Sequence, residues 1–283
     1  MIGKDRDQEA GVVEMSEQQG AQILGEIPRG SRLSTAAWLL FFAAVLLAWA
    51  GLFWQVVSLH GGAPFGALGV NFAWAGHAYL PGSQVLGMWA LMVLAMMLPT
   101  LLPMLGTLND LTCRLSANLV YLLAFTGGYL IVWLAFAILA AGLQLRLTSL
   151  GLVDAAGTFV RPGLTLALLL GAGLYQFSAL KQACLSACQA PLHYFIAHWR
   201  DGVGGAATMG LRHGLVCLGC CWALMALAFV GGTMNLLWMG LATLLMSVEK
   251  LPKIGVWVSP LIGGTLLALA LAFATHLTTH LYI

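Results

Sequence analysis

The chain has 283 residues, of which 60% are hydrophobic and only 8% are charged, whereas soluble domains carry roughly 25% charged residues. This composition excludes a large soluble domain and predicts an all-α, polytopic transmembrane helical bundle that lies in the lipid bilayer. The formal net charge is only +2, and no basic face is interleaved with aromatic residues, so nucleic acid is excluded as a partner.

The first 34 residues form the only long polar stretch of the chain and lack hydrophobic periodicity. Because such a stretch cannot bury enough apolar surface to fold, residues 1–34 are expected to be a disordered cytoplasmic tail. Residues 35–283 are expected to form the transmembrane domain.

Membrane spans can be located because the bilayer core needs about 20 apolar residues per helix. This measure gives about seven spans, or six if the short sixth segment does not cross. Their approximate ranges are 36–58, 83–105, 118–143, 163–185, 206–230, 232–248 and 256–280. The positive-inside rule favours a cytoplasmic amino terminus, because ten of the 12 Lys and Arg residues then lie inside and only Arg146 and Arg161 outside.

The second span carries a stripe of methionines at intervals of about one helical turn. These residues are Met88, Met92 and Met96, with Met97 beside them. Thioethers are soft ligands suited to Cu(I), so the stripe is a candidate second ligand set or path toward thiols. The alternative is that the methionines fill gaps in a crowded bundle. Pro99 and Pro103 follow and are expected to bend or open the helix.

The end of the fourth span reads KQACLSACQAP and places Cys184 and Cys188 four residues apart. This spacing puts both thiols on one side of a helix, where they can bind one metal ion together. Lys181 lies one turn before Cys184 and is expected to favour its thiolate form.

The fifth span contains CLGCCW, which places three thiols within five positions. Cys217 and Cys221 share a helical face with Gly210 and Gly214, a GxxxG pair that allows another helix to approach closely. Cys220 is turned roughly 100° away from Cys221 on the helical wheel. The thiols are therefore expected to face protein rather than lipid.

These two groups of cysteines are predicted to meet near the inner leaflet and to form a metal site. The predicted ligands are Cys184, Cys188, Cys217 and Cys221, with Cys220 or His213 as substitutes. Glu249 is a further candidate because a carboxylate in a membrane helix is often functional. A simpler interpretation is that Glu249 and Lys250 mark the inner boundary, where they pair with Arg212 or Lys253. For each cysteine alone, packing as a small hydrophobic residue is the alternative.

The combination of MWALMVLAMMLPTLLPM, KQACLSACQAP and GLRHGLVCLGCCWALMALAFVGGTMNLLWM with SVEK resembles one bacterial family over roughly residues 83–255. Its members are described as metal-binding integral membrane proteins of unknown function, and some are labelled copper chaperones. The resemblance implies metal binding by this core region and implies no established reaction. The residues at the family-like positions are Met88, Met92, Met96, Met97, Cys184, Cys188, His213, Cys217, Cys220, Cys221, Met234, Asn235 and Glu249.

The leading hypothesis is a bacterial inner-membrane protein that binds copper, as Cu(I), for transfer, delivery or homeostasis. Its expected partners are a metal donor or acceptor protein, or a copper-dependent membrane enzyme of which it is an accessory subunit. Zinc and iron are the alternative metals. The alternative function is an enzyme, a quinone-linked thiol-disulfide oxidoreductase that uses the CxxC at Cys217 and Cys220. That function is less favoured, because oxidising relays act at the periplasmic face, whereas the count of Lys and Arg residues places these thiols in the cytoplasmic half of the membrane.

Overall fold

The computed structural model describes residues 35–59, 81–112, 118–154, 156–233 and 235–281, and these residues are almost entirely helical. The predicted tail, Cys113 and Met234 lie outside the described residues. The helices are α2 Thr35–Leu59, α3 Gly82–Thr100, α4 Leu102–Thr112, α5 Asn118–Ser149, α6 Pro162–Tyr175, α7 Ala179–Gln189, α8 Pro191–His198, α9 Gly202–Ala226, α10 Ala228–Gly231, α11 Leu236–Glu249 and α12 Gly255–Leu281. The all-α class is thereby confirmed.

Five helical segments are long and apolar enough to cross a membrane, and α6 and α7 together form a sixth that bends by 60°. The arrangement is that of a multi-pass membrane protein, with many large apolar side chains exposed on its outer surface. The predicted seventh span corresponds to α11, which has only 14 residues. At about 1.5 Å per residue, α11 is roughly 21 Å long and shorter than the apolar core of a bilayer. The count of seven is therefore not confirmed, and the alternative of six agrees with the bent pair.

Two helix breaks shape the interior of the bundle. The second predicted span divides at Leu101, between α3 and α4, where Pro99 and Pro103 cannot donate backbone hydrogen bonds. The fourth span bends between Tyr175 and Ala179, and the Ser178 hydroxyl restarts the helix by accepting a hydrogen bond from the Lys181 backbone N–H. The second break turns α7 away from the axis of α6.

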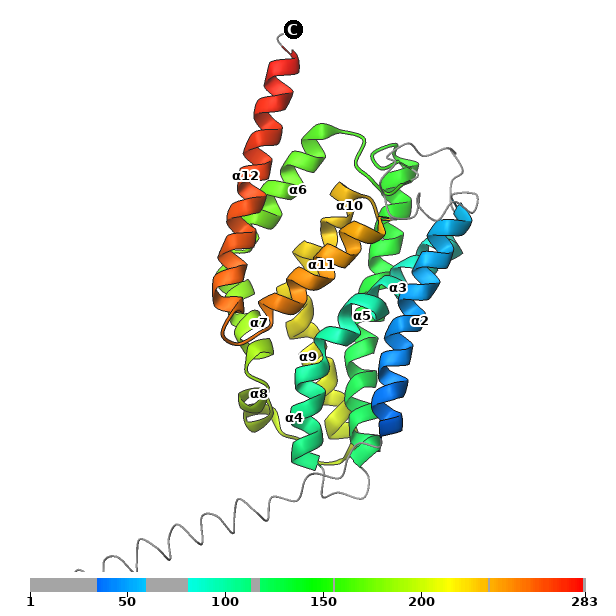
Figure 1. Cartoon of the computed structure of the whole chain (residues 1–283), viewed down its shortest axis with the longest axis vertical. Helices are drawn as coiled ribbons and strands as arrows, with labels where there is room; N and C mark the ends of the chain where they lie inside the picture. The colour runs from blue at the N-terminus through cyan, green and yellow to red at the C-terminus, as the bar shows by residue number, and fades with distance from the viewer. Residues whose placement is uncertain (1–34, 60–80, 113–117, 155, 234, 282–283) are drawn as a thin grey trace, which may run out of the picture.

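The central contact of the bundle is between α5 and α9, which pack along much of their length (Figure 1). A Cβ atom at Gly210 would overlap the carbonyl oxygen of Phe125, and one at Gly128 would overlap that of Ala207. The predicted close approach at Gly210 is confirmed, because only glycine leaves room for the neighbouring backbone.

Helix α11 crosses the bundle diagonally, and its carboxyl end lies near α7 (Figure 1). The chain then turns back, and α12 packs along α6. As a result, the end of α11 brings Glu249 and Lys250 into the interior, where their exposed fractions are 1% and 6%. Both side chains are buried against other helices and are not free surface charges, and their position at the inner membrane boundary stays a prediction.

Candidate metal centre

Three thiols of α9 lie in the middle of the bundle. Cys217, Cys220 and Cys221 are each at most 1% exposed. Cys220 Sγ lies 3.3 Å from Cys221 Sγ and donates to the Cys217 carbonyl oxygen at 3.1 Å. The expectation that the thiols face protein is confirmed, and it includes Cys220 because α7 covers the flank on which this residue lies.

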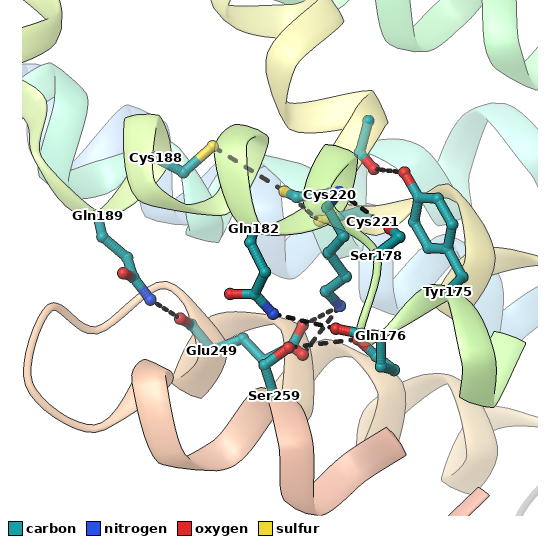
Figure 2. A network of polar contacts seen from close by, with 12 residues as sticks. Tyr175, Gln176, Ser178, Gln182, Cys188, Gln189, Cys220, Cys221, Glu249 and Ser259 are labelled. Carbon is teal, nitrogen blue, oxygen red and sulfur yellow. Dashed lines mark hydrogen bonds and ion pairs between the residues drawn. The ribbon is translucent and has the colours of Figure 1, made fainter. Parts of the chain in front are cut away.

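Helix α7 adds a fourth thiol, and this brings the two cysteine groups together. Cys188 is buried, and its Sγ lies 4.0 Å from Cys220 Sγ; Figure 2 shows the two thiols pointing toward each other. The sulfur atoms of Cys188, Cys217 and Cys220 all lie within 4.8 Å of one another. These three residues form what we call the thiol cluster.

Cys184 lies next to the thiol cluster but is not one of its three members. A Cβ atom at Gly219 would lie 2.6 Å from Cys184 Sγ, so the thiol packs against the α9 backbone between Cys217 and Cys220. Cys184 is only partly buried. The structure thus brings all five predicted cysteines to one place, with Cys220 rather than Cys184 in the tightest group.

A buried ammonium group contacts the thiol cluster, and the sequence analysis did not predict this contact. Lys250 Nζ donates to Cys217 Sγ at 3.1 Å and to Thr100 Oγ1 at 2.8 Å. The Tyr129 hydroxyl lies 3.2 Å from the same sulfur. The only signal for this contact in the sequence is a lysine at the end of an apolar segment, which is equally typical of a membrane boundary. Because the ammonium favours a neighbouring thiolate, Cys217 is the cysteine best placed to carry negative charge.

A buried ion pair joins α7 to α11, and Figure 2 shows its carboxylate residue, Glu249, below Cys188 and Cys220. Lys181 Nζ donates to both carboxylate oxygens of Glu249, at 2.9 and 3.0 Å. Gln189 Nε2 donates to the Glu249 carbonyl oxygen at 2.7 Å. Glu249 therefore pairs with Lys181 and not with Arg212 or Lys253, and its carboxylate neutralises the charge that was expected to act on Cys184. Breaking such a buried pair is strongly destabilising, so these contacts fix α7 and its Cys188 in place.

Comparison with known protein families also indicates metal binding. The model of the PpoB2 copper chaperone family matches residues 86–273, about two thirds of the chain. The chain belongs to the copper chaperone family. This confirms the resemblance drawn from the sequence, and the matched region contains every predicted site residue. No curated protein and no solved structure matches the chain.

In this copper chaperone family member, His213 lies one turn before Cys217 and is 2% exposed. Its ring stacks on Phe125 and Tyr129, with centroid separations of 5.9 and 5.7 Å. Its Nδ1 has no hydrogen-bond partner among the described residues. Burial raises the pKa of the adjacent Tyr194, which stays a neutral phenol and donates to the Met209 carbonyl oxygen at 2.7 Å. Aromatic packing explains the position of His213, and its free nitrogen keeps it a candidate ligand.

The four methionines of the predicted stripe are all buried in α3. Their exposed fractions do not exceed 2%, so none of them faces lipid. The Met97 carbonyl oxygen accepts a hydrogen bond from Tyr129 at 3.2 Å, which joins the end of α3 to the tyrosine that contacts Cys217. The ligand role of Met88, Met92, Met96 and Met97 stays a prediction.

Proposed function

We propose that this protein binds Cu(I) through Cys188, Cys217 and Cys220 and passes it to a partner at the bacterial inner membrane. The observation that supports this function best is that three buried sulfur atoms, contributed by two helices, lie within 4.8 Å of one another. Thiolates are soft ligands and favour Cu(I) over the harder divalent ions.

The spacing of the thiol cluster fits a single metal ion. With metal–sulfur bonds of about 2.3 Å, three sulfurs in a trigonal plane are separated by about 4 Å. The Cys188–Cys220 separation of 4.0 Å already has this value. The cluster therefore needs only small side-chain adjustments to enclose an ion.

The charges near the thiol cluster also suit Cu(I). When one of the three cysteines binds as a neutral thiol, the two remaining thiolates and one Cu(I) carry a net charge of −1. The Lys250 ammonium, 3.1 Å from Cys217 Sγ, balances this charge. Lys181 and Glu249 neutralise each other. Electrical neutrality matters because an unpaired charge is costly in a medium of low dielectric constant. Three thiolates with Zn(II) reach the same balance, so zinc is the nearest alternative metal.

Transfer requires a ligand that an incoming or outgoing partner can reach. We infer that Cys184, which is partly buried and packs against Gly219, exchanges the ion between the thiol cluster and a donor or acceptor protein. Cys221, 3.3 Å from Cys220, adds a further thiol for this exchange. His213 and the methionines of α3 are proposed as auxiliary ligands on either side, and the amino terminus is proposed to be cytoplasmic.

A thiol-disulfide relay through Cys217 and Cys220 is less well supported. Both thiols are at most 1% exposed, and a relay thiol must be accessible to its partner disulfide. The Cys220 thiol also contacts the Cys217 carbonyl oxygen, Cys221 Sγ and Cys188 Sγ, so it does not form an isolated pair with Cys217. We therefore favour metal binding over redox exchange.

Metal analysis of the purified, reduced full chain tests the proposal. Wild type is expected to bind one Cu(I) per chain in competition with a chromogenic Cu(I) chelator and to retain it against excess Zn(II). Cys188→Ser and Cys217→Ser should each lower the occupancy to roughly a tenth or less at the same chelator concentration, since each removes a soft ligand. Cys113→Ser, outside the predicted ligand set, is the matched control.

Three results would contradict the proposal. Unchanged copper occupancy in both ligand variants would place the metal elsewhere. Displacement of Cu(I) by Zn(II) would show that copper is not the metal this site prefers. The absence of bound metal in wild type would reject the metal-binding function itself.

A further inference from the structure

A polar cavity lies between the end of α8 and the first turns of α9, outside the thiol cluster. Its volume is about 240 Å³. The polar side chains that line it come from both helices and their connection: His198, Trp199, Arg200, Thr208 and Arg212. The metal-binding proposal uses none of these residues.

The cavity carries a net positive charge, because two arginines line it and only one carboxylate, Asp201, is adjacent to them in the chain. Arg200 and Arg212 are both exposed, and the only ion pair found among the described residues joins Lys181 to Glu249. The neighbouring carboxylate, Asp201, accepts a hydrogen bond from Trp199 Nε1 at 2.8 Å instead. Two guanidinium groups that form no ion pair with a carboxylate of the described residues favour an anion with several oxygen atoms, such as a phosphate.

His198 is also placed to contribute to this cavity. Its Nδ1 donates to the Tyr194 carbonyl oxygen at 2.9 Å, which fixes the ring at the end of α8. Its other ring nitrogen has no partner in the part of the chain that the structure describes. This nitrogen remains available for a ligand oxygen.

The depth of the cavity corresponds to the lipid headgroups. The span Gly202–Gly231 has 30 residues, or about 45 Å, which exceeds the apolar core of a bilayer by roughly 15 Å. No charged residue follows Arg212 in this span, so its first ten residues account for the excess length. Thr208 and Arg212 therefore lie at the boundary between headgroups and acyl chains.

Apolar side chains are exposed on the two helices that line the cavity, which favours a lipid over a free anion. Leu192 and Ile196 lie one turn apart on α8 and are 53% and 72% exposed. Val203, at the start of α9, is 46% exposed. An occupant with an anionic head and apolar chains would contact both the guanidinium groups and these side chains.

We propose that this cavity binds the phosphate group of an anionic phospholipid. Arg200 and Arg212 hold the phosphate oxygens, His198 supplies a third polar contact, and Leu192 and Ile196 contact the acyl chains. Basic pockets at the ends of membrane helices bind lipid headgroups for the same electrostatic reason. The bound lipid would fix α8 against α9 at one face of the bundle.

Lipid binding by the purified full chain tests this proposal. Native mass spectrometry of the protein in mixed micelles would compare phosphatidylglycerol with phosphatidylcholine. Wild type is expected to prefer the anionic lipid by about tenfold or more, and R200Q/R212Q should lose most of this preference, because each cation near the headgroups contributes about 1 kcal/mol. R161Q is the matched control, since Arg161 is exposed and precedes α6 at the opposite end of the bundle (Figure 1).

Inorganic phosphate is the third arm of the experiment. If it displaces phosphatidylglycerol at equal concentration, the ligand is free phosphate and the lipid assignment is wrong. An unchanged preference in R200Q/R212Q would also overturn the proposal, as would an equal loss in R161Q. Both replaced arginines are exposed, and an unchanged thermal midpoint of R200Q/R212Q in lipid-free detergent would show that the variant is folded.

Discussion

The contact between Lys250 and Cys217 is the residue-scale feature with the clearest chemical consequence. An ammonium group buried in a membrane protein needs a partner, and Lys250 donates to one sulfur and one hydroxyl oxygen. Hydrogen bonds of this kind to charged groups contribute about 1.5–3 kcal/mol. Lys250 should therefore stabilise the thiolate form of Cys217 and the anionic copper complex formed from it.

Replacing Lys250 by Met keeps the length of the side chain and removes its charge. We expect the dissociation constant for Cu(I) to rise by about 10- to 100-fold, which corresponds to the loss of one charged hydrogen bond. Competition with a chromogenic Cu(I) chelator measures this change. Lys253→Met is the matched control, because Lys253 lies three residues further on and is exposed. Equal affinities of Lys250→Met and wild type would show that the lysine has no electrostatic role.

At the scale of elements, the close packing of α5 against α9 depends on glycines. Gly210 and Gly214 were recognised as a contact face from their spacing in the sequence, and the structure places Phe125 and Val132 of α5 against them. Gly128 of α5 was not predicted to be a contact residue, although the Ala207 backbone of α9 packs directly against it. Its only sequence signal, a Gly-Gly pair within an apolar helix, does not identify a partner.

A pair of glycines in α9 allows the importance of this packing to be measured. Gly210→Ala would place a methyl group against the Phe125 carbonyl oxygen, and such overpacking typically costs about 1–3 kcal/mol. Gly204→Ala is the matched control in the same helix, because no atom lies within 4 Å of its added methyl group. There, alanine should leave stability unchanged or raise it by up to about 1 kcal/mol.

Thermal unfolding of the two glycine variants in detergent separates these expectations. A lower midpoint for Gly210→Ala together with an unchanged or higher one for Gly204→Ala supports the close α5–α9 contact. Equal unfolding midpoints for the two variants would contradict it, because α5 and α9 could then move apart to accommodate the methyl group without loss of stability.

The elements also show where sequence reasoning succeeded and where it failed. Long apolar segments and two prolines were enough to predict most helices and the break at Leu101, because both signals are local. The two cysteine groups were predicted to meet, because both lay near the same end of their spans. The path of α11 was not predictable, since its end is held by Lys181 and Gln189 of α7, more than 55 positions earlier. The burial of Lys250 follows from that path.

At the scale of the whole molecule, α11 decides the relative position of the chain ends. It is too short to cross a bilayer alone, yet it returns the chain from α10 to the level of α7 before α12 begins (Figure 1). The start of α2 and the end of α12 consequently lie at opposite ends of the bundle (Figure 1). The seven-span prediction also places the two chain ends on opposite sides of the membrane. If α11 did not return the chain across the membrane, the six remaining crossings would place both ends on one side.

Reporter fusions can test this topology directly. A phosphatase that needs disulfide bonds is active only outside the cytoplasm, and it should be inactive at the amino terminus and active at the carboxyl terminus. Insertions at 150–152 and 199–201 serve as internal controls, because the connection before α6 and the one before α9 lie at opposite ends of the bundle (Figure 1). The first insertion should be active and the second inactive if the positive-inside rule holds. Equal activity at both termini would show that α11 does not reverse the chain across the membrane.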